Sequence, residues 1–113
     1  MRILVVEDDR LLNNTLCYNL NAAGYTVDSA LTKQAAKDFL TKQDYDLIVL
    51  DVNLPDGNGF DFCREAKERC PDTTVIFLTA NDMESKVQHT KRCGKFEFLN
   101  IQLFTHHIYS TIF

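Results

Sequence analysis

The apolar run Leu47–Leu50 places the strictest limit on how this chain folds, because it contains no polar residue and stops at Asp51. A short apolar run bounded by charge is typical of a strand that is buried on both faces of a parallel sheet. Pro55, Gly57 and Gly59 predict a tight turn after this strand. Asp51 is therefore expected at the carboxyl end of a central strand, where open α/β sheets place their sites. On its own, such an aspartate is more often a simple cap of the turn than a functional residue.

Further strands are predicted on both sides of this run, and helical patterns separate them. The other strands are expected at residues 3–6, 25–30 and 75–78. The first helical pattern begins at a cap, either Asp8 or Asp9, and ends at Gly24. The other two run from Thr32 to Leu40 and from Asn58 to Arg69. This regular alternation predicts a doubly wound parallel α/β sheet with helices on both faces.

The final third of the chain has a weaker pattern. A fourth helix is expected at residues 82–93, a fifth strand at 96–101, and a short tail at 103–113 that favours helix poorly. Residues 1–85 carry 8 basic and 15 acidic side chains (net −7), whereas residues 86–113 carry 4 and 1 (net +3). No linker interrupts the 113 residues, so we expect one domain over residues 1–113 whose segment 86–113 is divergent and shortened.

Composition excludes several classes of protein. A net charge of −4 argues against a nucleic-acid or membrane surface, and no apolar stretch approaches the roughly 18 residues of a membrane span. The first residues lack the pattern of a signal peptide. The four cysteines have neither CxxC nor zinc-site spacing, which favours reduced thiols in a cytoplasmic protein.

The predicted topology gathers polar side chains at one edge of the sheet. Glu7 and Asp8 follow the first strand, Asp51 ends the third, and Thr79 ends the fourth. Three carboxylates in one crevice stay ionised together only when a cation neutralises them, and oxygen ligands of this kind suit Mg²⁺. The Thr79 hydroxyl can donate to a phosphoryl oxygen. The set therefore suits phosphorylation of Asp51, with the carboxylate as nucleophile.

The chain resembles the receiver domain of two-component response regulators. The segments ILVVEDD, DLIVLDVNLPDGNGF and VIFLTA match the signatures of that family in order and separation, and the close match covers residues 2–85. The resemblance implies a flavodoxin-like sheet of five parallel strands. It also implies a signalling module of a phosphorelay and not an enzyme. Details of the first 85 residues resemble regulators of transcription that carry a DNA-binding winged helix.

The resemblance also implies roles for individual residues. Asp51 would accept a phosphoryl group from a sensor histidine kinase. The implied Mg²⁺ ligands are Asp8 and Asp51 directly, Glu7 through water, and the backbone carbonyl of Asn53. Thr79 and Ala80 would sense the phosphoryl group, and Phe98 on the fifth strand would be the aromatic switch.

The chain departs from the family where a Lys-Pro-Phe motif normally ends the fifth strand. Counting without gaps places Ile101 at the lysine position, and no lysine follows Lys95. Two explanations are open: natural divergence, or a change of reading frame near Val87, which we favour. A nucleotide sequence that encodes a Lys-Pro-Phe ending in another frame would establish the second explanation. Loss of the lysine should impair coupling to the output.

Two alternative functions are kept beside the phospho-accepting receiver. The first is a pseudo-receiver that only binds other proteins. The second is an Mg²⁺-dependent phosphohydrolase with Asp51 as nucleophile, but Asn53 stands where such enzymes usually carry a second acid. Besides the kinase, a homodimer through the C-terminal face is expected, because a shortened last helix would leave apolar surface uncovered. No nucleic acid or membrane is expected to bind this domain itself.

Overall fold

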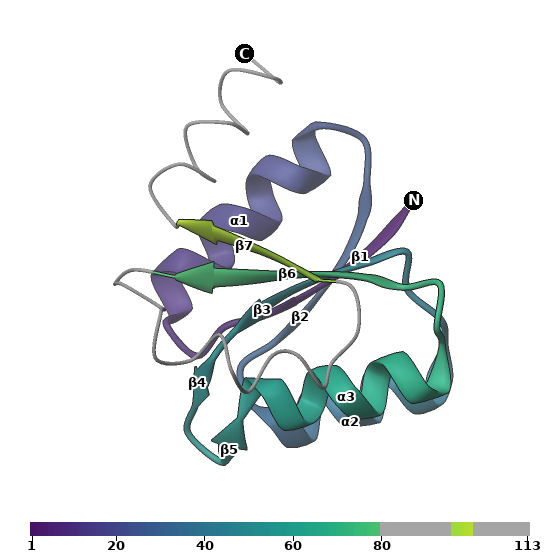
Figure 1. Cartoon of the computed structure of the whole chain (residues 1–113). Coiled ribbons are helices and arrows are strands. Elements are labelled where there is room, and N and C mark those ends of the chain that lie inside the picture. The colour runs from purple at the N-terminus through teal and green to yellow at the C-terminus, as the bar shows by residue number, and fades with distance from the viewer. Residues whose placement is uncertain (80–95, 101–113) are drawn as a thin grey trace.

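Five parallel strands form a single sheet in the order β2-β1-β3-β6-β7 (Figure 1). The computed structural model describes residues 1–79 and 96–100. The strands of the sheet are β1 (Arg2–Val6), β2 (Thr26–Ala30), β3 (Leu47–Asp51), β6 (Thr74–Thr79) and β7 (Phe96–Asn100). The predicted doubly wound, five-stranded parallel sheet is therefore confirmed. The predicted strands differ from these bounds by one residue at most.

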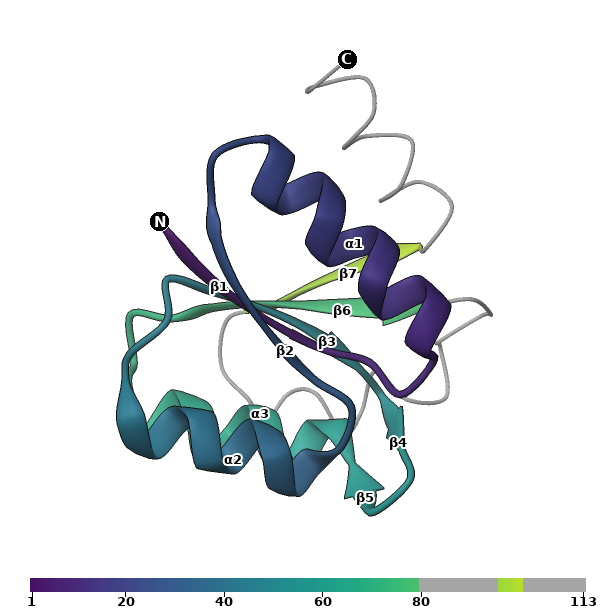
Figure 2. The same ribbon diagram turned by 180° about the vertical axis from the view of Figure 1, so that it is seen from behind.

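Helices cover both faces of the sheet. α1 (Arg10–Ala22) lies on one face, whereas α2 (Lys33–Lys42) and α3 (Gly59–Arg69) lie on the other (Figures 1 and 2). Successive side chains of a strand point to opposite faces, so a continuous apolar run supplies both layers of the core. Leu4 and Val6 of β1 accordingly join the cluster beneath α2 and α3. Ile3 and Val5 join the cluster beneath α1.

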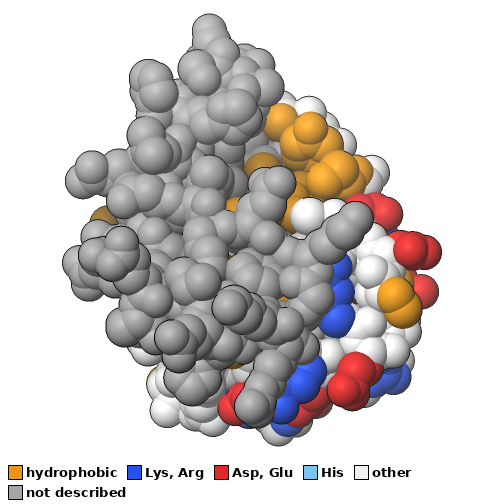
Figure 3. Space-filling model, viewed as in Figure 1, with side chains coloured by type: hydrophobic (Ala, Val, Ile, Leu, Met, Phe, Trp, Pro, Cys, Tyr) orange, Lys and Arg blue, Asp and Glu red, His pale blue; other side chains and the backbone are white. Residues whose placement is uncertain are grey.

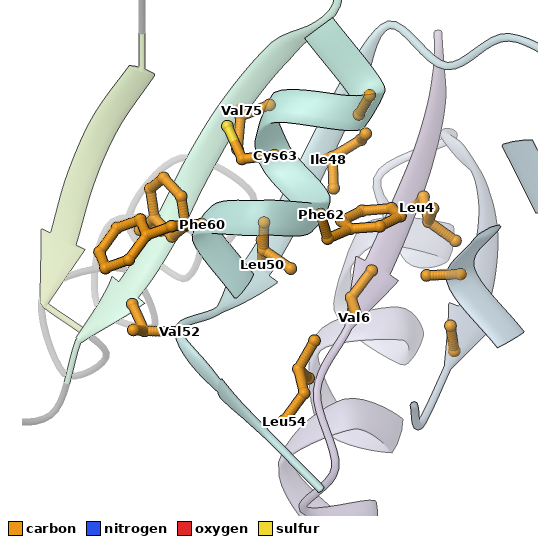
Figure 4. Packing of buried hydrophobic residues seen from close by; sticks show 14 of the residues in the cluster. Leu4, Val6, Ile48, Leu50, Val52, Leu54, Phe60, Phe62, Cys63 and Val75 are labelled. Carbon is orange, nitrogen blue, oxygen red and sulfur yellow. The ribbon is translucent and has the colours of Figure 1, made fainter. Parts of the chain in front are cut away.

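Two aromatic side chains of α3 enter the core beneath this helix. Phe60 and Phe62 point from α3 towards apolar side chains of the sheet (Figure 4). The ring of Phe60 packs against that of Phe77, with 4.8 Å between the ring centroids. This packing fixes the start of α3 against β3 and β6, and so fixes the loop that follows Asp51.

Each helix begins at a side chain that caps its first turn. Asp9 accepts a hydrogen bond from Leu12 N (3.1 Å), Thr32 from Ala35 N (3.1 Å) and Asn58 from Phe60 N (2.6 Å). The predicted starts of the helices are therefore confirmed, and Asp9 is the cap of α1 in place of Asp8. After α1 the chain turns at Gly24, whose φ of +97° is readily adopted only by glycine.

A short hairpin that the sequence pattern did not predict follows β3. It consists of β4 (Asn53–Leu54) and β5 (Gly57–Asn58), which pair antiparallel. The carboxylate of Asp56 at its tip accepts hydrogen bonds from Lys33 N (2.7 Å) and Gln34 N (2.9 Å). These bonds lower the pKa of Asp56. The loop after Asp51 is thereby attached to the N-terminus of α2.

The described surface is mixed in character. Charged side chains of both signs lie near one another over the described part of the face in Figure 3. Leu11 and Tyr18 are exposed apolar side chains of α1. None of the helices within residues 1–79 has the length and apolar character needed to cross a bilayer. The predicted fourth helix at residues 82–93, the divergent segment 86–113 apart from β7, and the tail at 103–113 lie outside the described residues.

Candidate functional site

The candidate site lies at the carboxyl ends of β1 and β3, which are neighbours in the sheet. The register pairs Val6 with Leu50, so Glu7 and Asp51 each come one residue after this pair. On the other side, Asp51 is paired with Leu78 of β6, and Thr79 follows. Parallel pairing therefore brings segments from the start, middle and later part of the chain to one edge, as the sequence predicted.

Three carboxylates converge at this edge, and we call Glu7, Asp8 and Asp51 the acid triad. One carboxylate oxygen from each residue lies within 4.8 Å of the others. Glu7 is buried, Asp51 is half-buried and Asp8 is exposed. No ion pair within the described parts of the chain involves any member of the triad. The negative charges therefore oppose one another without a neutralising side chain among the described residues.

Burial changes the acid chemistry of Glu7 and Asp51. It raises the pKa of Glu7 to about 8, and the nearby Asp51 adds to this increase. It also raises the pKa of Asp51. Glu7 Oε2 is buried and has no hydrogen-bond partner among the described residues. A buried carboxylate oxygen without a donor is costly, and a hard divalent cation with its bound water would satisfy it and offset the repulsion. The residues therefore fit a cation coordinated by oxygen ligands.

The raised pKa of Glu7 predicts how the stability of the metal-free domain depends on pH. The folded protein holds the Glu7 proton up to about pH 8, whereas the unfolded chain releases it near 4.5. Stability from this group is thus complete below pH 4.5 and is lost as pH rises towards 8, by at most about 1.4 kcal/mol per unit. Chemical denaturation in a chelator should show this loss in the wild type, and Glu7→Gln should remove most of it. Equal slopes for both proteins would contradict the prediction.

The loop after Asp51 is held close to the strand tip. Asn53 N donates a hydrogen bond to Asp51 Oδ1 (3.2 Å), and Gly59 N donates to Val52 O (2.8 Å). A Cβ atom added at Gly59 would lie 2.3 Å from Asp51 O, so only glycine fits without a backbone shift. The sequence predicted Gly59 as part of a turn, and the structure shows that a glycine at this position also permits the close approach to Asp51 O.

The remaining predicted site residues are placed by their backbones. Thr79 is the last residue of β6, and Phe98 of β7 is paired in register with Phe77. Ala80 and Ile101 lie outside the described residues. The assigned roles of these four residues stay predictions.

One residue beside the site was missed by the sequence analysis. Asn13 of α1 is fully buried, and its side chain donates a hydrogen bond to the carbonyl oxygen of Glu7 (2.9 Å). A signal was present, because Asn13 is three residues before Leu16 and so shares the inner face of the helix. A polar residue on an apolar face indicates a buried hydrogen-bond network.

Comparison with known proteins agrees with this geometry. The family model of the response regulator receiver domain matches residues 3–112. The transcriptional regulatory protein BasR of Escherichia coli (strain K12) is 39% identical over 82 residues, which cover 73% of this chain and 37% of BasR. The transcriptional regulatory protein QseB of Escherichia coli O157:H7 is 36% identical over 89 residues, which cover 78% of this chain and 41% of QseB. The chain thus spans about two fifths of the length of these relatives.

Solved structures of receiver domains are also similar to this chain. The non-phosphorylated HemR receiver domain from Leptospira biflexa is 34% identical, with a TM-score of 0.82 and coverage of 98% of this chain and 93% of that one. The BeF3-activated DrrB receiver domain is 29% identical, with a TM-score of 0.76 and coverage of 96% and 94%. Receiver domains are signalling modules, so the phosphohydrolase and pseudo-receiver alternatives are not favoured. With the family model matching residues 3–112, the chain belongs to the receiver domain family of two-component response regulators.

Proposed function

We propose that this domain accepts a phosphoryl group from a sensor histidine kinase on Asp51, with Mg²⁺ bound beside it. The observation that carries the proposal is the acid triad, whose carboxylate oxygens lie within 4.8 Å of one another at the carboxyl edge of the sheet. Asp8 and Asp51 would bind the ion directly, with Glu7 acting through water and the backbone carbonyl of Asn53 completing the set. These ligands are all oxygen, as Mg²⁺ prefers.

The chemistry assigned to Asp51 is a nucleophilic displacement at phosphorus. A carboxylate oxygen of Asp51 forms a bond to phosphorus while the bond from phosphorus to the imidazole nitrogen of the kinase breaks, and the imidazole keeps that electron pair. Asn53 N, which donates to Asp51 Oδ1, holds the carboxylate in one orientation and leaves the second oxygen for attack. Bound Mg²⁺ would offset the charge that gathers on the phosphoryl oxygens.

The response to phosphorylation is assigned to residues of β6 and β7 and the residue that follows β6. We propose that Thr79 and Ala80 sense the phosphoryl group and that Phe98 acts as the aromatic switch. β6 and β7 are adjacent and in register, which supports a path from Thr79 to Phe98. Ile101 stands at the lysine position. We therefore expect the structural response to phosphorylation to be weakened more than phosphorylation of Asp51 itself.

The outcome of phosphorylation, the domain organisation and the cellular location are also proposals. BasR and QseB are transcriptional regulatory proteins, so control of transcription is the proposed outcome of phosphorylation here. The family match from residue 3 to 112 supports a single receiver domain over residues 1–113. We assign this domain to the cytoplasm, where response regulators receive their signal. Pairing of two copies through the C-terminal face stays a prediction.

Phosphorylation with acetyl phosphate tests the function directly. With MgCl2 present, the intact mass of the domain should rise by one phosphoryl group, and a chelator should prevent the increase because the acid triad then repels the dianionic donor. Peptide mapping should place the group on Asp51. An unmodified domain, under conditions that label a known receiver domain in the same tube, would contradict the proposal.

A further inference from the structure

The side chain of Asn13 joins three segments of the chain at the edge where the acid triad lies. Asn13 Nδ2 donates to the carbonyl oxygens of Glu7 (2.9 Å) and Ala30 (3.2 Å). Asn13 Oδ1 accepts from Ser29 Oγ (2.6 Å) and Cys17 Sγ (3.2 Å). An amide side chain has two donor hydrogens and two acceptor lone pairs, so every hydrogen-bonding position of Asn13 is used.

These contacts also fix which way the amide points. Rotation by 180° would bring Oδ1 against two backbone carbonyl oxygens, both of which are acceptors only. The hydroxyl of Ser29 and the thiol of Cys17 stabilise the observed orientation from the other side. With the side chain fully buried, water offers no alternative partner, so the network has a single arrangement.

The network acts at the place where regular strand pairing stops. The last pair between β1 and β2 is Val6 with Ala30, so Glu7 lies beyond the ladder. Glu7 N donates to Ala30 O (3.1 Å), and Asn13 supplies the donor for Glu7 O. The carbonyl of Glu7 belongs to the peptide group that leads into Asp8, so fixing its oxygen fixes the plane from which Asp8 projects.

We infer that Asn13 is a positioning residue for the Mg²⁺ site: its amide fixes the Glu7–Asp8 peptide and so presents both carboxylates towards Asp51. This inference rests on the proposed function. Asn13 does not touch the phosphoryl group and is not a catalytic residue. It acts as the outer partners of metal ligands generally do, by holding ligands in the geometry that the ion requires.

Titration of Mg²⁺ into variants tests this role without relying on activity. Asn13→Leu keeps a side chain of similar size but removes the donor to Glu7 O, so its Kd for Mg²⁺ by calorimetry should rise about 10-fold or more. At saturating MgCl2 its rate of labelling by acetyl phosphate should approach the wild-type rate. Asn19→Leu is the matched control, because Asn19 is also a buried asparagine of α1 but lies about 9 Å further along the helix than Asn13. Asn19→Leu should leave the Kd for Mg²⁺ unchanged, whatever its effect on the melting temperature.

A second pair of variants keeps the test decisive if Asn13→Leu does not fold. Ser29 is exposed apart from its hydroxyl contact, so Ser29→Ala should fold while removing a donor that orients Asn13. The Kd of Ser29→Ala for Mg²⁺ should rise about 3-fold. Ser29→Thr keeps a hydroxyl and should have the wild-type Kd. If Asn13→Leu folds and has the wild-type Kd for Mg²⁺, the inference is wrong. If Asn13→Leu does not fold, a wild-type Kd in Ser29→Ala shows the same. Either result leaves the proposed function standing. Failure of the wild type to bind Mg²⁺ overturns the proposed function instead.

Discussion

Replacing Asp51 with asparagine is expected to abolish labelling of the domain by acetyl phosphate. The amide of Asn lacks the anionic oxygen that attacks phosphorus, and neither Glu7 nor Asp8 occupies the tip of the central strand β3. The substitution also removes the negative charge of Asp51, which is repelled by that of Asp8. The metal-free variant should therefore be at least as stable as the wild type near neutral pH, and loss of labelling cannot be attributed to unfolding.

The matched control for this prediction is Asp56→Asn. Asp56 lies five residues further along the same loop and is exposed, and its carboxylate bonds to the N-terminus of α2 and not to the triad. Asp56→Asn should be labelled at close to the wild-type rate by intact-mass analysis. Labelling of Asp51→Asn at the wild-type rate would place the acceptor on another residue and contradict the assignment.

The pH dependence of stability in the wild type and in Asp51→Asn also reports on Glu7. The charge of Asp51 contributes to the raised pKa of Glu7, although burial is the larger cause. In Asp51→Asn the pKa of Glu7 should fall part of the way towards its ordinary value. The loss of stability between pH 4.5 and 8 should then become smaller than in the wild type, when both are measured in chelator.

The sheet and the position of Asp51 could be predicted from sequence because each depends on a local pattern. Strands buried on both faces require continuous apolar runs, and Leu47–Leu50 is such a run. Parallel alternation then decides which ends meet, so Glu7 and Asp51 could be placed together before their side chains were seen. The helix starts were equally local, since a cap such as Thr32 bonds within its own first turn.

Features that depend on contacts between distant segments could not be predicted in the same way. Asp56 bonds to Lys33 and Gln34, more than 20 residues away, so the β4–β5 hairpin has no short-range signature beyond its turn residues. The raised pKa of Glu7 results from how deeply the folded chain buries it. Periodicity shows that a residue faces inward, but it does not show which partners the residue finds there.

Gly59 gives the second large effect that we expect. In Gly59→Ala the new Cβ would lie 2.3 Å from Asp51 O and 3.0 Å from Val52 Cα, and both are backbone atoms. α3 cannot simply move away, because Phe60 and Phe62 anchor its first turn in the core. The strand tip must therefore shift. We expect a loss of about 3 kcal/mol or more in the free energy of unfolding, together with slower labelling of Asp51 by acetyl phosphate.

Gly24→Ala separates strain at the site from the general effect of replacing a glycine. Gly24 has a φ of +97°, so alanine there is strained, but nothing lies within 4 Å of the added Cβ. It precedes β2, at the end of the sheet opposite to the acid triad. Gly24→Ala should lose only about 1–2 kcal/mol and keep the wild-type rate of labelling, since the strain is confined to one turn. If Gly59→Ala were no less stable than Gly24→Ala and were labelled as fast, the contact between Gly59 and the Asp51 backbone would not be what positions the acceptor.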